Sequence, residues 1–322
     1  MPYDVTITDV LRAAKTISGR VRHTPMEFSP SLGKAVGAEV WLKLENQQIA
    51  GSFKIRGALN RMSMMNANDR ERGVITCSSG NHAQGMAIAA RTLGIRAVIC
   101  VPGQCPQIKR EAIIEMGGSY VELRIIGTFF DEAEEEAQRM ADREGLLFVS
   151  AFDDPLVSAG QGVVGLEILH DEPELDAIIC PISGAGLIRG VGVAAKALRR
   201  GIKIWGAHAN ANPSWQEALR IGRVEPVVEE ISIADALGGH ACQNHFDFVR
   251  DELEGVAGVS EREIKNGIKF LLREHRQVAE GGGAVAVAAL LAGNIDVAGL
   301  KVCAVVSGRN IGLEEFTKAI GE

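Results

Sequence analysis

A lysine lies where an apolar strand gives way to a helix-like run, in the segment GSFKIRGALN (Gly51–Asn60). Lys54 stands among a glycine, a serine and a phenylalanine. A lysine near a helix N-terminus meets the positive end of the helix macrodipole and gains nothing from it. If it is partly buried there, its amine has a lowered pKa and can act as a nucleophile towards a carbonyl. The sequence leaves open the commoner alternative, an exposed lysine in a first helical turn.

A second loop gathers two hydroxyls, a glycine, an amide and an imidazole within five residues. CSSGNHAQG (Cys77–Gly85) follows the apolar run GVIT and opens a helix. Serine, glycine and asparagine suit a turn and a helix N-cap, so a structural role is one interpretation. The alternative is that backbone N–H groups at the helix start bind a carboxylate while a serine hydroxyl works beside it.

A third loop, PISGAGLIRG (Pro181–Gly190), follows a predicted strand and opens a helix. Small residues there let backbone N–H groups approach an anion at the positive helix end, as in a phosphate site. The dinucleotide pattern fails because Arg189 stands where a glycine or alanine is needed, and no acidic residue ends the next strand, which reaches His208. The P-loop pattern also fails, so a ligand with a single phosphate group remains the plausible one for this loop.

A fourth loop, VVSGRNIG (Val305–Gly312), follows the last predicted strand. Ser307 or Asn310 could cap a helix here. The functional alternative is that the Ser307 hydroxyl points into the same cleft as the other three loops.

The elements that position these loops alternate along the chain. Short apolar runs predict buried strands at 96–101, 176–182, 202–207 and 301–306, and helical stretches such as Ala83–Leu93 and Gly186–Leu198 lie between them. This alternation predicts an α/β fold with mostly parallel sheets covered by helices. Ligands in such folds bind beyond the carboxyl ends of the strands. The acidic run at Asp131–Gly145 is interpreted as a solvated helix face.

Length and composition narrow the class of protein. The 322 residues suggest two lobes, and the net charge of -7 with no basic stripe argues against nucleic-acid binding. No apolar run is long enough to span a membrane and the N-terminus has no signal-peptide pattern, so we expect a cytoplasmic protein. The six cysteines are scattered and are expected to be reduced and buried. His240, Cys242 and His245 are close enough in the sequence to suggest a zinc site, but no second ligand pair follows, and no metal is predicted.

Together the four loops resemble the threonine dehydratase and serine racemase family of pyridoxal-phosphate enzymes. The family signature is specific only when its motifs occur together, and each motif alone is a weak indicator. The motifs are GSFKIRGA, SSGNHAQG and GQG in series, followed by the glycine-containing loop. The likeness extends from RHTP (Arg22–Pro25) to the last strand. Further family positions are matched by AFDDP (Ala151–Pro155), GQGVVGLEI (Gly160–Ile168) and ADAL (Ala234–Leu237), and these are expected to be architectural. The resemblance implies two lobes with the fold of the tryptophan synthase β subunit, fold type II. Residues 1–47 and 146–322 would form the large cofactor-binding domain, and 48–145 a small mobile domain carrying the lysine and the substrate loop.

The resemblance also implies roles for individual residues, with pyridoxal 5'-phosphate as the cofactor. Lys54 would form the Schiff base and take the Cα proton, and Ser79 would act as the acid/base opposite it. The cofactor ring would be contacted by Phe53, Asn81, Glu280 and Ser307, the last at the pyridine nitrogen. The phosphate would be held by Ser183, Gly184, Ala185, Gly186 and Leu187. The substrate carboxylate would be held by Ser78, Ser79, Asn81 and His82.

Some positions depart from the family pattern. His208 and Ala209 stand where metal-dependent relatives have Glu-Pro, which argues against the family's divalent metal site. Arg189 is an added charge that either contacts an anion or faces solvent, and we expect solvent. SIADALGG (Ser232–Gly239) and the segment His275–Ile295 look closer to the hydroxyectoine-utilisation dehydratases than to biosynthetic threonine dehydratases.

The predicted activity is β-elimination from a threonine- or serine-like amino acid, giving a 2-oxo acid and ammonia. A neutral serine at the pyridine nitrogen does not enforce a pyridinium, which favours elimination over transamination. Two enzymatic alternatives remain: a dehydratase for a hydroxylated diaminobutyrate, and an amino-acid racemase. A catalytically silent pyridoxal-phosphate binder is the non-enzymatic alternative, and the presence of Lys54, Ser79 and Ser307 argues against it. The resemblance further implies a homodimer with a small-molecule substrate.

Overall fold

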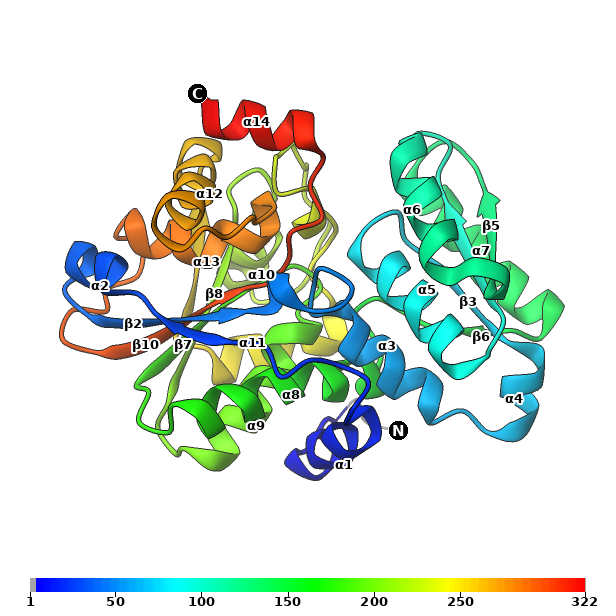
Figure 1. The fold of residues 1–322 in the computed structure, drawn as a ribbon, viewed down its shortest axis with the longest axis horizontal. Coiled ribbons are helices and arrows are strands. Elements are labelled where there is room, and N and C mark those ends of the chain that lie inside the picture. Colours follow the sequence, from blue (N-terminus) through cyan, green and yellow to red (C-terminus); the bar gives the residue numbers. More distant parts are fainter. Residues whose placement is uncertain (1–3, 322) are drawn as a thin grey trace.

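The computed structural model describes residues 4–321, and its larger sheet lies at the centre of the larger lobe (Figure 1). Six strands pair in the order β1-β2-β10-β7-β8-β9, all parallel except β1 against β2. Their bounds are β1 (Met26–Phe28), β2 (Glu39–Leu44), β7 (Ala177–Pro181), β8 (Lys203–Ala209), β9 (Gly255–Val259) and β10 (Lys301–Val306). The strands predicted at 176–182, 202–207 and 301–306 are confirmed as β7, β8 and β10.

The smaller sheet belongs to a separate lobe. Four parallel strands pair in the order β5-β4-β3-β6. They are β3 (Val74–Cys77), β4 (Ala97–Val101), β5 (Val121–Ile125) and β6 (Leu147–Phe148). The strand predicted at 96–101 is confirmed as β4. Because β6 pairs with β3, this sheet continues to Phe148, past the boundary expected at residue 145.

Helices cover both faces of each sheet, as the strand–helix alternation predicts. Around the larger sheet lie α1 (Ile7–Ile17), α2 (Pro30–Val36), α8 (Pro155–Asp171), α9 (Gly186–Leu198), α10 (Ser214–Ile221), α11 (Phe246–Glu252), α12 (Glu261–His275), α13 (Gly281–Leu291) and α14 (Leu313–Gly321). Around the smaller sheet lie α4 (Ala67–Arg72), α5 (Asn81–Leu93), α6 (Gln107–Gly117) and α7 (Phe130–Glu144). Short 3-10 turns occupy Glu45–Gln47, Gly118–Tyr120, Asp235–Leu237 and Gln243–His245.

The α3 helix (Lys54–Ser63) lies between the two lobes (Figure 1). Glycines allow it to approach α8 closely: a Cβ at Gly160 would lie 2.7 Å from the Arg56 carbonyl oxygen, and one at Gly57 would lie 2.8 Å from the Val157 carbonyl oxygen. On the other side of α8, a Cβ at Gly162 would lie 2.8 Å from the Gly190 carbonyl oxygen of α9. The GQG motif at 160–162 therefore packs helices, which confirms its architectural interpretation.

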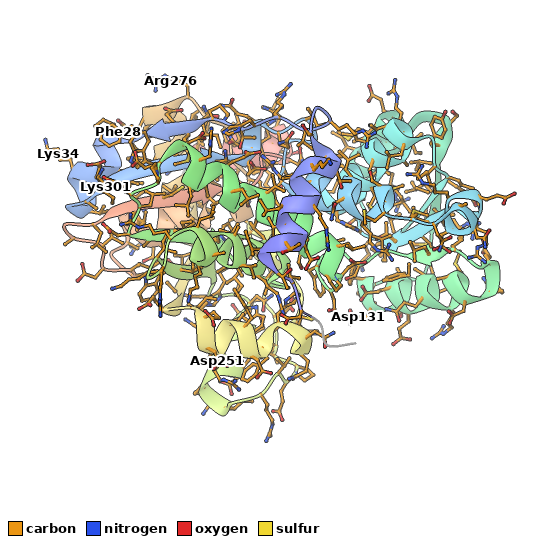
Figure 2. The ribbon with its side chains drawn as sticks, turned by 90° about the horizontal axis from the view of Figure 1, so that it is seen from below. Phe28, Lys34, Asp131, Asp251, Arg276 and Lys301 are labelled. Carbon is orange, nitrogen blue, oxygen red and sulfur yellow. The ribbon has the colours of Figure 1, made fainter. Side chains whose placement is uncertain are left out.

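Burial patterns explain two of the helices directly. Residues 281–290 of α13 are all buried, because this apolar helix lies inside the core that includes β8 and β10. In contrast, α7 buries a narrow stripe around Ala133 and Ala137, and its acidic residues such as Asp131 face outward (Figure 2). The solvated helix face expected at 131–145 is confirmed. Within residues 4–321 the structure has no helix long and apolar enough to cross a membrane.

Candidate active site

The lysine loop and the last-strand loop lie side by side. Ser52 and Gly308 form an antiparallel bridge. The Phe53 N–H donates to the Ser307 carbonyl oxygen at 3.2 Å, and the Arg309 N–H donates to the Gly51 carbonyl oxygen at 2.9 Å. The start of α3 is thus fixed against the carboxyl end of β10, where ligands of α/β folds bind.

Lys54 is not an ordinary surface lysine. It begins α3, and its Nζ donates to the Ala151 carbonyl oxygen at 2.9 Å and lies 5.3 Å from the centre of the Phe53 ring. Burial lowers the pKa of the Lys54 ammonium to about 8, although the Glu280 carboxylate acts to raise it. About a tenth of this amine is therefore neutral and nucleophilic at pH 7, far more than of an ordinary lysine. The alternative of an exposed first-turn lysine is excluded.

A chain of buried polar groups lies next to this loop. The Asn81 amide donates to Glu280 at 2.6 Å, and the Asn310 amide donates to the Asn81 side-chain oxygen at 2.5 Å. Burial raises the pKa of the Glu280 carboxyl to about 8, against the hydrogen bond from Asn81, which lowers it. Gly308 leaves room for this carboxyl, because a Cβ there would lie 2.0 Å from Glu280 Oε1. Asn310 belongs to this series of hydrogen-bonded groups, although the sequence suggested it only as a helix cap. Nothing in its sequence position indicated a contact with Asn81.

The substrate loop joins β3 to α5. The Ser78 hydroxyl accepts a hydrogen bond from the Gly80 N–H at 3.2 Å, and Gly80 is the N-cap of the 13-residue helix α5. Ser79 is half-buried between them. The first N–H groups of α5 have no partner within the helix, so they are free to receive an anion.

The His82 side chain points elsewhere. Its Nε2 lies 3.4 Å from the Val149 carbonyl oxygen, and burial lowers the pKa of its imidazole to about 3, with Lys54 lowering it further. The imidazole is therefore neutral, and its Nδ1 has no hydrogen-bond partner among the described residues. Whatever His82 contributes to an anion must come from its backbone N–H or from this buried nitrogen.

The third loop has the shape of a phosphate cradle. Ala185 has φ of +68° and caps the 13-residue helix α9, an unusual conformation for a residue with a side chain. A Cβ at Gly184 would lie 2.2 Å from Phe152 Cγ, so only glycine fits beneath that ring. Ser183 is held by Trp215, whose indole N–H donates to the Ser183 carbonyl oxygen, and its hydroxyl donates to the Gly238 carbonyl oxygen at 3.2 Å.

The segment leading into α8 contacts two of these loops at once. The Ala151 carbonyl accepts from Lys54, and the ring of the next residue, Phe152, covers Gly184. The sequence predicted only architecture for AFDDP. A carbonyl partner has no signature in the sequence, which is why this contact was missed.

These residues fit pyridoxal phosphate. A buried amine of lowered pKa lies at one end, and a helix N-terminus with small residues, suited to a phosphate, lies at another. The Ser307 hydroxyl is buried and donates only a 3.3 Å hydrogen bond to the Gly282 carbonyl oxygen. The buried Ser52 hydroxyl has no partner among the described residues, which leaves it available to a bound group.

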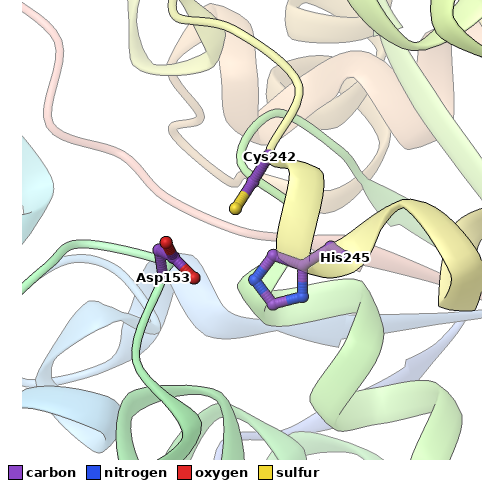
Figure 3. A group of neighbouring side chains, drawn as sticks. All are labelled: Asp153, Cys242 and His245. Carbon is purple, nitrogen blue, oxygen red and sulfur yellow. The ribbon is translucent and has the colours of Figure 1, made fainter. Parts of the chain in front are cut away.

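One expectation about a charged residue is corrected. Arg189 is buried, not solvent-facing: it donates to the Asn244 carbonyl oxygen at 2.8 Å and lies 5.6 Å from the centre of the Phe248 ring. His240, Cys242 and His245 do not come together as a trio of ligands, because His240 is half exposed beside Glu229. Cys242 and His245 instead converge with Asp153, their ligand atoms within 4.8 Å of one another (Figure 3).

The position of the family's divalent metal site holds a buried histidine. His208 Nδ1 lies 2.8 Å from the Ala209 carbonyl oxygen and 3.0 Å from the Asn212 carbonyl oxygen, so this nitrogen carries a proton and donates. Burial lowers the pKa of the ring, which is therefore neutral. A histidine N–H directed at these carbonyls is a poor substitute for an acidic ligand.

Comparisons with known proteins agree with this geometry. The family model described as "Pyridoxal-phosphate dependent enzyme" matches residues 17–308. The chain is 39% identical to L-threonine ammonia-lyase of Thermotoga maritima, over 99% of this chain and 79% of that protein. It is 33% identical to the catabolic L-threonine dehydratase TdcB of Escherichia coli K12, over 98% of this chain and 96% of that protein.

A solved structure, that of maize serine racemase, superposes with a TM-score of 0.92 at 31% identity and covers 98% of this chain and 97% of that one. Its similarity confirms the two-lobed α/β fold of tryptophan synthase β type. The geometry of the lysine and of the third loop indicates the same class of enzyme as these relatives do. The chain belongs to the pyridoxal-phosphate dependent enzymes, in the group of the threonine dehydratases and serine racemases, and it is a pyridoxal-phosphate-dependent lyase.

Proposed function

We propose that this enzyme eliminates the β-hydroxyl of L-threonine or L-serine and yields a 2-oxo acid and ammonia. The observation that carries the proposal is Lys54, a buried amine of lowered pKa fixed where strand ends meet. Relatives named for L-threonine, which span nearly all of this chain, support the substrate class.

In this proposal the residues of the four loops have separate roles in binding the cofactor and the substrate. Residues Ser183–Leu187 would hold the cofactor phosphate at the N-terminus of α9, and Asn81 and Ser307 would contact the ring, with Phe53 and Glu280 beside it. Bound pyridoxal phosphate supplies an electron sink that acidifies the Cα–H bond of an amino acid. A serine hydroxyl at the ring nitrogen is a neutral partner, which keeps that sink weak and favours loss of a β-leaving group.

The chain's own groups then move the protons. Lys54 Nζ would take the Cα proton, and a pKa of about 8 suits an amine that must be free to accept one. Backbone N–H groups at the start of α5, with Ser78 beside them, would hold the substrate carboxylate. Loss of the β-hydroxyl as water gives an enamine, which hydrolyses to the 2-oxo acid and ammonia.

A second candidate is elimination from a hydroxylated diaminobutyrate. Asp235 of the large lobe forms an ion pair with Lys109 of the small lobe at 2.8 Å, in the segment that departs from biosynthetic threonine dehydratases. A second amine on a substrate would compete with the Lys109 ammonium for this carboxylate. The resemblance to hydroxyectoine-utilisation dehydratases supports the same substrate.

Racemisation is a third activity to test. It needs an acid/base on the face of Cα opposite Lys54, and Ser79 is the proposed group. The similarity in fold to maize serine racemase supports it.

We further propose a cytoplasmic homodimer with no nucleic-acid or membrane partner. The cysteines are all free and buried, as suits a reducing compartment, and the net charge is -7. Light scattering of the purified protein tests the dimer: a mass near 34.4 kDa would contradict it.

The test of function is ammonia release by the purified holoenzyme. The panel contains L-threonine, L-serine, their D forms, threo-3-hydroxyaspartate and the hydroxylated diaminobutyrate. Fast turnover of L-threonine or L-serine supports the proposal, and turnover of the diamino acid alone moves the assignment to the second candidate. Cofactor binding without turnover of any substrate would identify a silent binder and contradict both.

A further inference from the structure

The segment Ser150–Asp154 joins two parts of the active site. Its Ala151 carbonyl accepts the hydrogen bond from Lys54 Nζ at 2.9 Å. Its next residue, Phe152, covers the phosphate loop so closely that a Cβ at Gly184 or at Gly186 would lie 2.2 Å or 3.0 Å from it. The position of this one segment therefore sets where the Lys54 amine lies relative to the phosphate loop.

Two side chains of the large lobe hydrogen-bond the Phe152 carbonyl oxygen at the centre of the segment. The Ser158 hydroxyl donates to it at 3.4 Å, and His245 lies closer. His245 is fully buried, and its Nε2 lies 3.1 Å from the Phe152 carbonyl oxygen. Its Nδ1 faces Arg189 Nη1 at 3.5 Å. A guanidinium only donates, so it requires Nδ1 to be unprotonated, and the ring proton must lie on Nε2. The Nε2–H then donates to the Phe152 carbonyl, and burial, which lowers the pKa of His245 to about 4, keeps the ring neutral.

Neighbouring hydrogen bonds stabilise the contact between His245 and the Phe152 carbonyl. The Asn244 amide donates to both oxygens of Asp153 at 3.0 and 3.1 Å, and the Arg189 guanidinium donates to the Asn244 carbonyl. Cys242 points at Asp153 (Figure 3), and burial raises the pKa of its thiol to about 12, so it is a protonated neighbour of the carboxylate. Three residues of one 3-10 turn and its flank thus bind two consecutive residues of the segment.

The same three side chains raise the question of a metal ion. Asp153, Cys242 and His245 have the ligand atoms for one. However, the nitrogen that faces the cluster is the one that donates to Phe152, and the other nitrogen faces a cation. Metal-binding histidines instead direct their second N–H at an acceptor. Hydrogen bonding therefore accounts for the cluster better than a metal does.

We propose that His245 is a positioning residue, which holds the Phe152 carbonyl through Nε2–H and thereby fixes Lys54 relative to the phosphate loop. The inference rests on the proposed role of Lys54 as the amine that binds the cofactor. His245 contacts neither the cofactor nor the substrate in this role.

The test compares three variants of the full-length protein. His245→Gln keeps a donor near the position of Nε2, His245→Asn is too short to place one there, and His245→Leu has none. The readouts are the dissociation constant of pyridoxal phosphate from the apoprotein and the pH dependence of its borohydride trapping on Lys54. We expect the Asn and Leu variants to bind the cofactor roughly tenfold more weakly, because the Phe152 carbonyl then loses its shorter hydrogen bond and keeps the longer one, from Ser158 Oγ at 3.4 Å. The Gln variant should restore affinity to within about threefold, well inside the cost of one lost hydrogen bond.

The matched control is another buried histidine. His275 hydrogen-bonds Ser29 and Glu27 on the opposite face of the larger sheet. His275→Leu should lower the free energy of unfolding without changing cofactor affinity. Equal weakening of cofactor binding by His245→Leu and His275→Leu, or wild-type affinity in His245→Asn, would overturn the proposal.

Two further measurements cover the remaining outcomes. If the Asn and Leu variants do not fold, the nitrogen-15 shifts of His245 in the wild-type protein decide, with protonated Nε2 expected and protonated Nδ1 overturning the proposal. Stoichiometric Zn²⁺ binding that is lost in Cys242→Ser, with cofactor affinity that falls on chelation, would replace it by a metal site. None of these readouts requires turnover, so they stay separate from failure of the substrate panel. A wild-type protein that traps no cofactor on Lys54 would instead contradict the proposed role of the lysine.

Discussion

Lys54 and Arg56 stand two residues apart on the first turn of α3 and have opposite surroundings. Lys54 is half-buried, and Arg56 is fully buried. Arg56 Nε donates to Glu45 at 2.8 Å and its Nη1 donates to Glu167 at 2.6 Å. Burial alone would lower the pKa of this guanidinium, but the two carboxylates more than offset it and the pKa is raised. Lys43 joins the network through Glu167 at 2.8 Å.

Lys54 has only a backbone carbonyl as its partner at hydrogen-bond distance, and within residues 4–321 no carboxylate forms an ion pair with it. Its pKa accordingly falls to about 8. The contrast shows that burial by itself does not define a functional cation. A buried cation with carboxylate partners holds the lobes together, and one without them is held ready for proton transfer or for covalent chemistry.

The largest expected effect is on Lys54→Ala. Ammonia release should fall by roughly a thousandfold or more, because the variant loses both the amine that binds the cofactor and the base at Cα. The measurement is turnover with L-threonine and L-serine at saturating cofactor. Lys34→Ala, at an exposed lysine, is the control and should match the wild type. If Lys54→Ala kept activity within tenfold of the control, Lys54 would not be the reactive amine and its contrast with Arg56 would be wrong.

The next effect is on stability at Arg56. Arg56→Met should lower the free energy of unfolding by about 3–5 kcal/mol, since Glu45 and Glu167 would be left buried without a cation. Urea denaturation of the apoprotein measures it. Arg139→Met, which breaks an exposed ion pair on α7, should cost less than about 1 kcal/mol. Equal losses in the two variants would show that the network around Arg56 is not structural.

Glu280 should make the free energy of unfolding depend on pH. Its pKa is about 8 in the folded protein against 4.5 in the unfolded chain. Between these values the folded state retains a proton that the unfolded chain has released, so stability falls as pH rises through this window. The slope approaches about 1.4 kcal/mol per pH unit at most. Glu280→Gln should remove this fall in apoprotein denaturation series at pH 5–8, and parallel curves for variant and wild type would refute the buried protonated carboxyl.

Lys54→Met should stabilise the apoprotein, the reverse of the effect at Arg56. The lowered pKa means that the folded state holds the ammonium less well than the unfolded chain does. The cost of the buried charge is present in full below about pH 8 and disappears as pH rises to 10.5. Removing the charge should therefore add about 2 kcal/mol at pH 7 and little at pH 10.5. A destabilised Lys54→Met at pH 7 would mean that Lys54 is a paired cation like Arg56.

The smallest expected effect is at Ser79. Gly80, not Ser79, caps α5, so Ser79→Ala should change the free energy of unfolding by less than about 0.5 kcal/mol. Elimination should stay nearly intact and racemisation should disappear, if Ser79 reprotonates Cα. Ser119→Ala, at an exposed serine, is the matched control and should leave both activities unchanged. Racemisation that persists in Ser79→Ala would refute the acid/base role.

Much of the fold was readable from the sequence, for local reasons. The apolar runs at β4, β7, β8 and β10 are bounded by turns, and α9 covers the range expected for it, Gly186–Leu198. The third and fourth loops therefore follow β7 and β10 directly, as expected.

What could not be read depends on contacts between distant segments. The Lys54 partner is a backbone carbonyl 97 residues away, which no residue type announces. Arg189 was expected in solvent because its burial depends on the turn at 243–245, which packs against it only in the folded chain. The strand β6 was not predicted, because it is two residues long and has no periodicity of its own.

The most direct test of the central claim is borohydride reduction of the holoenzyme followed by peptide mass mapping. The account predicts one reduced cofactor per chain, on the peptide that contains Lys54, with trapping lost in Lys54→Ala. Reduced cofactor on a peptide with another lysine, such as the carboxylate-paired Lys43, or on no peptide at all, would contradict the assignment of Lys54 as the reactive amine.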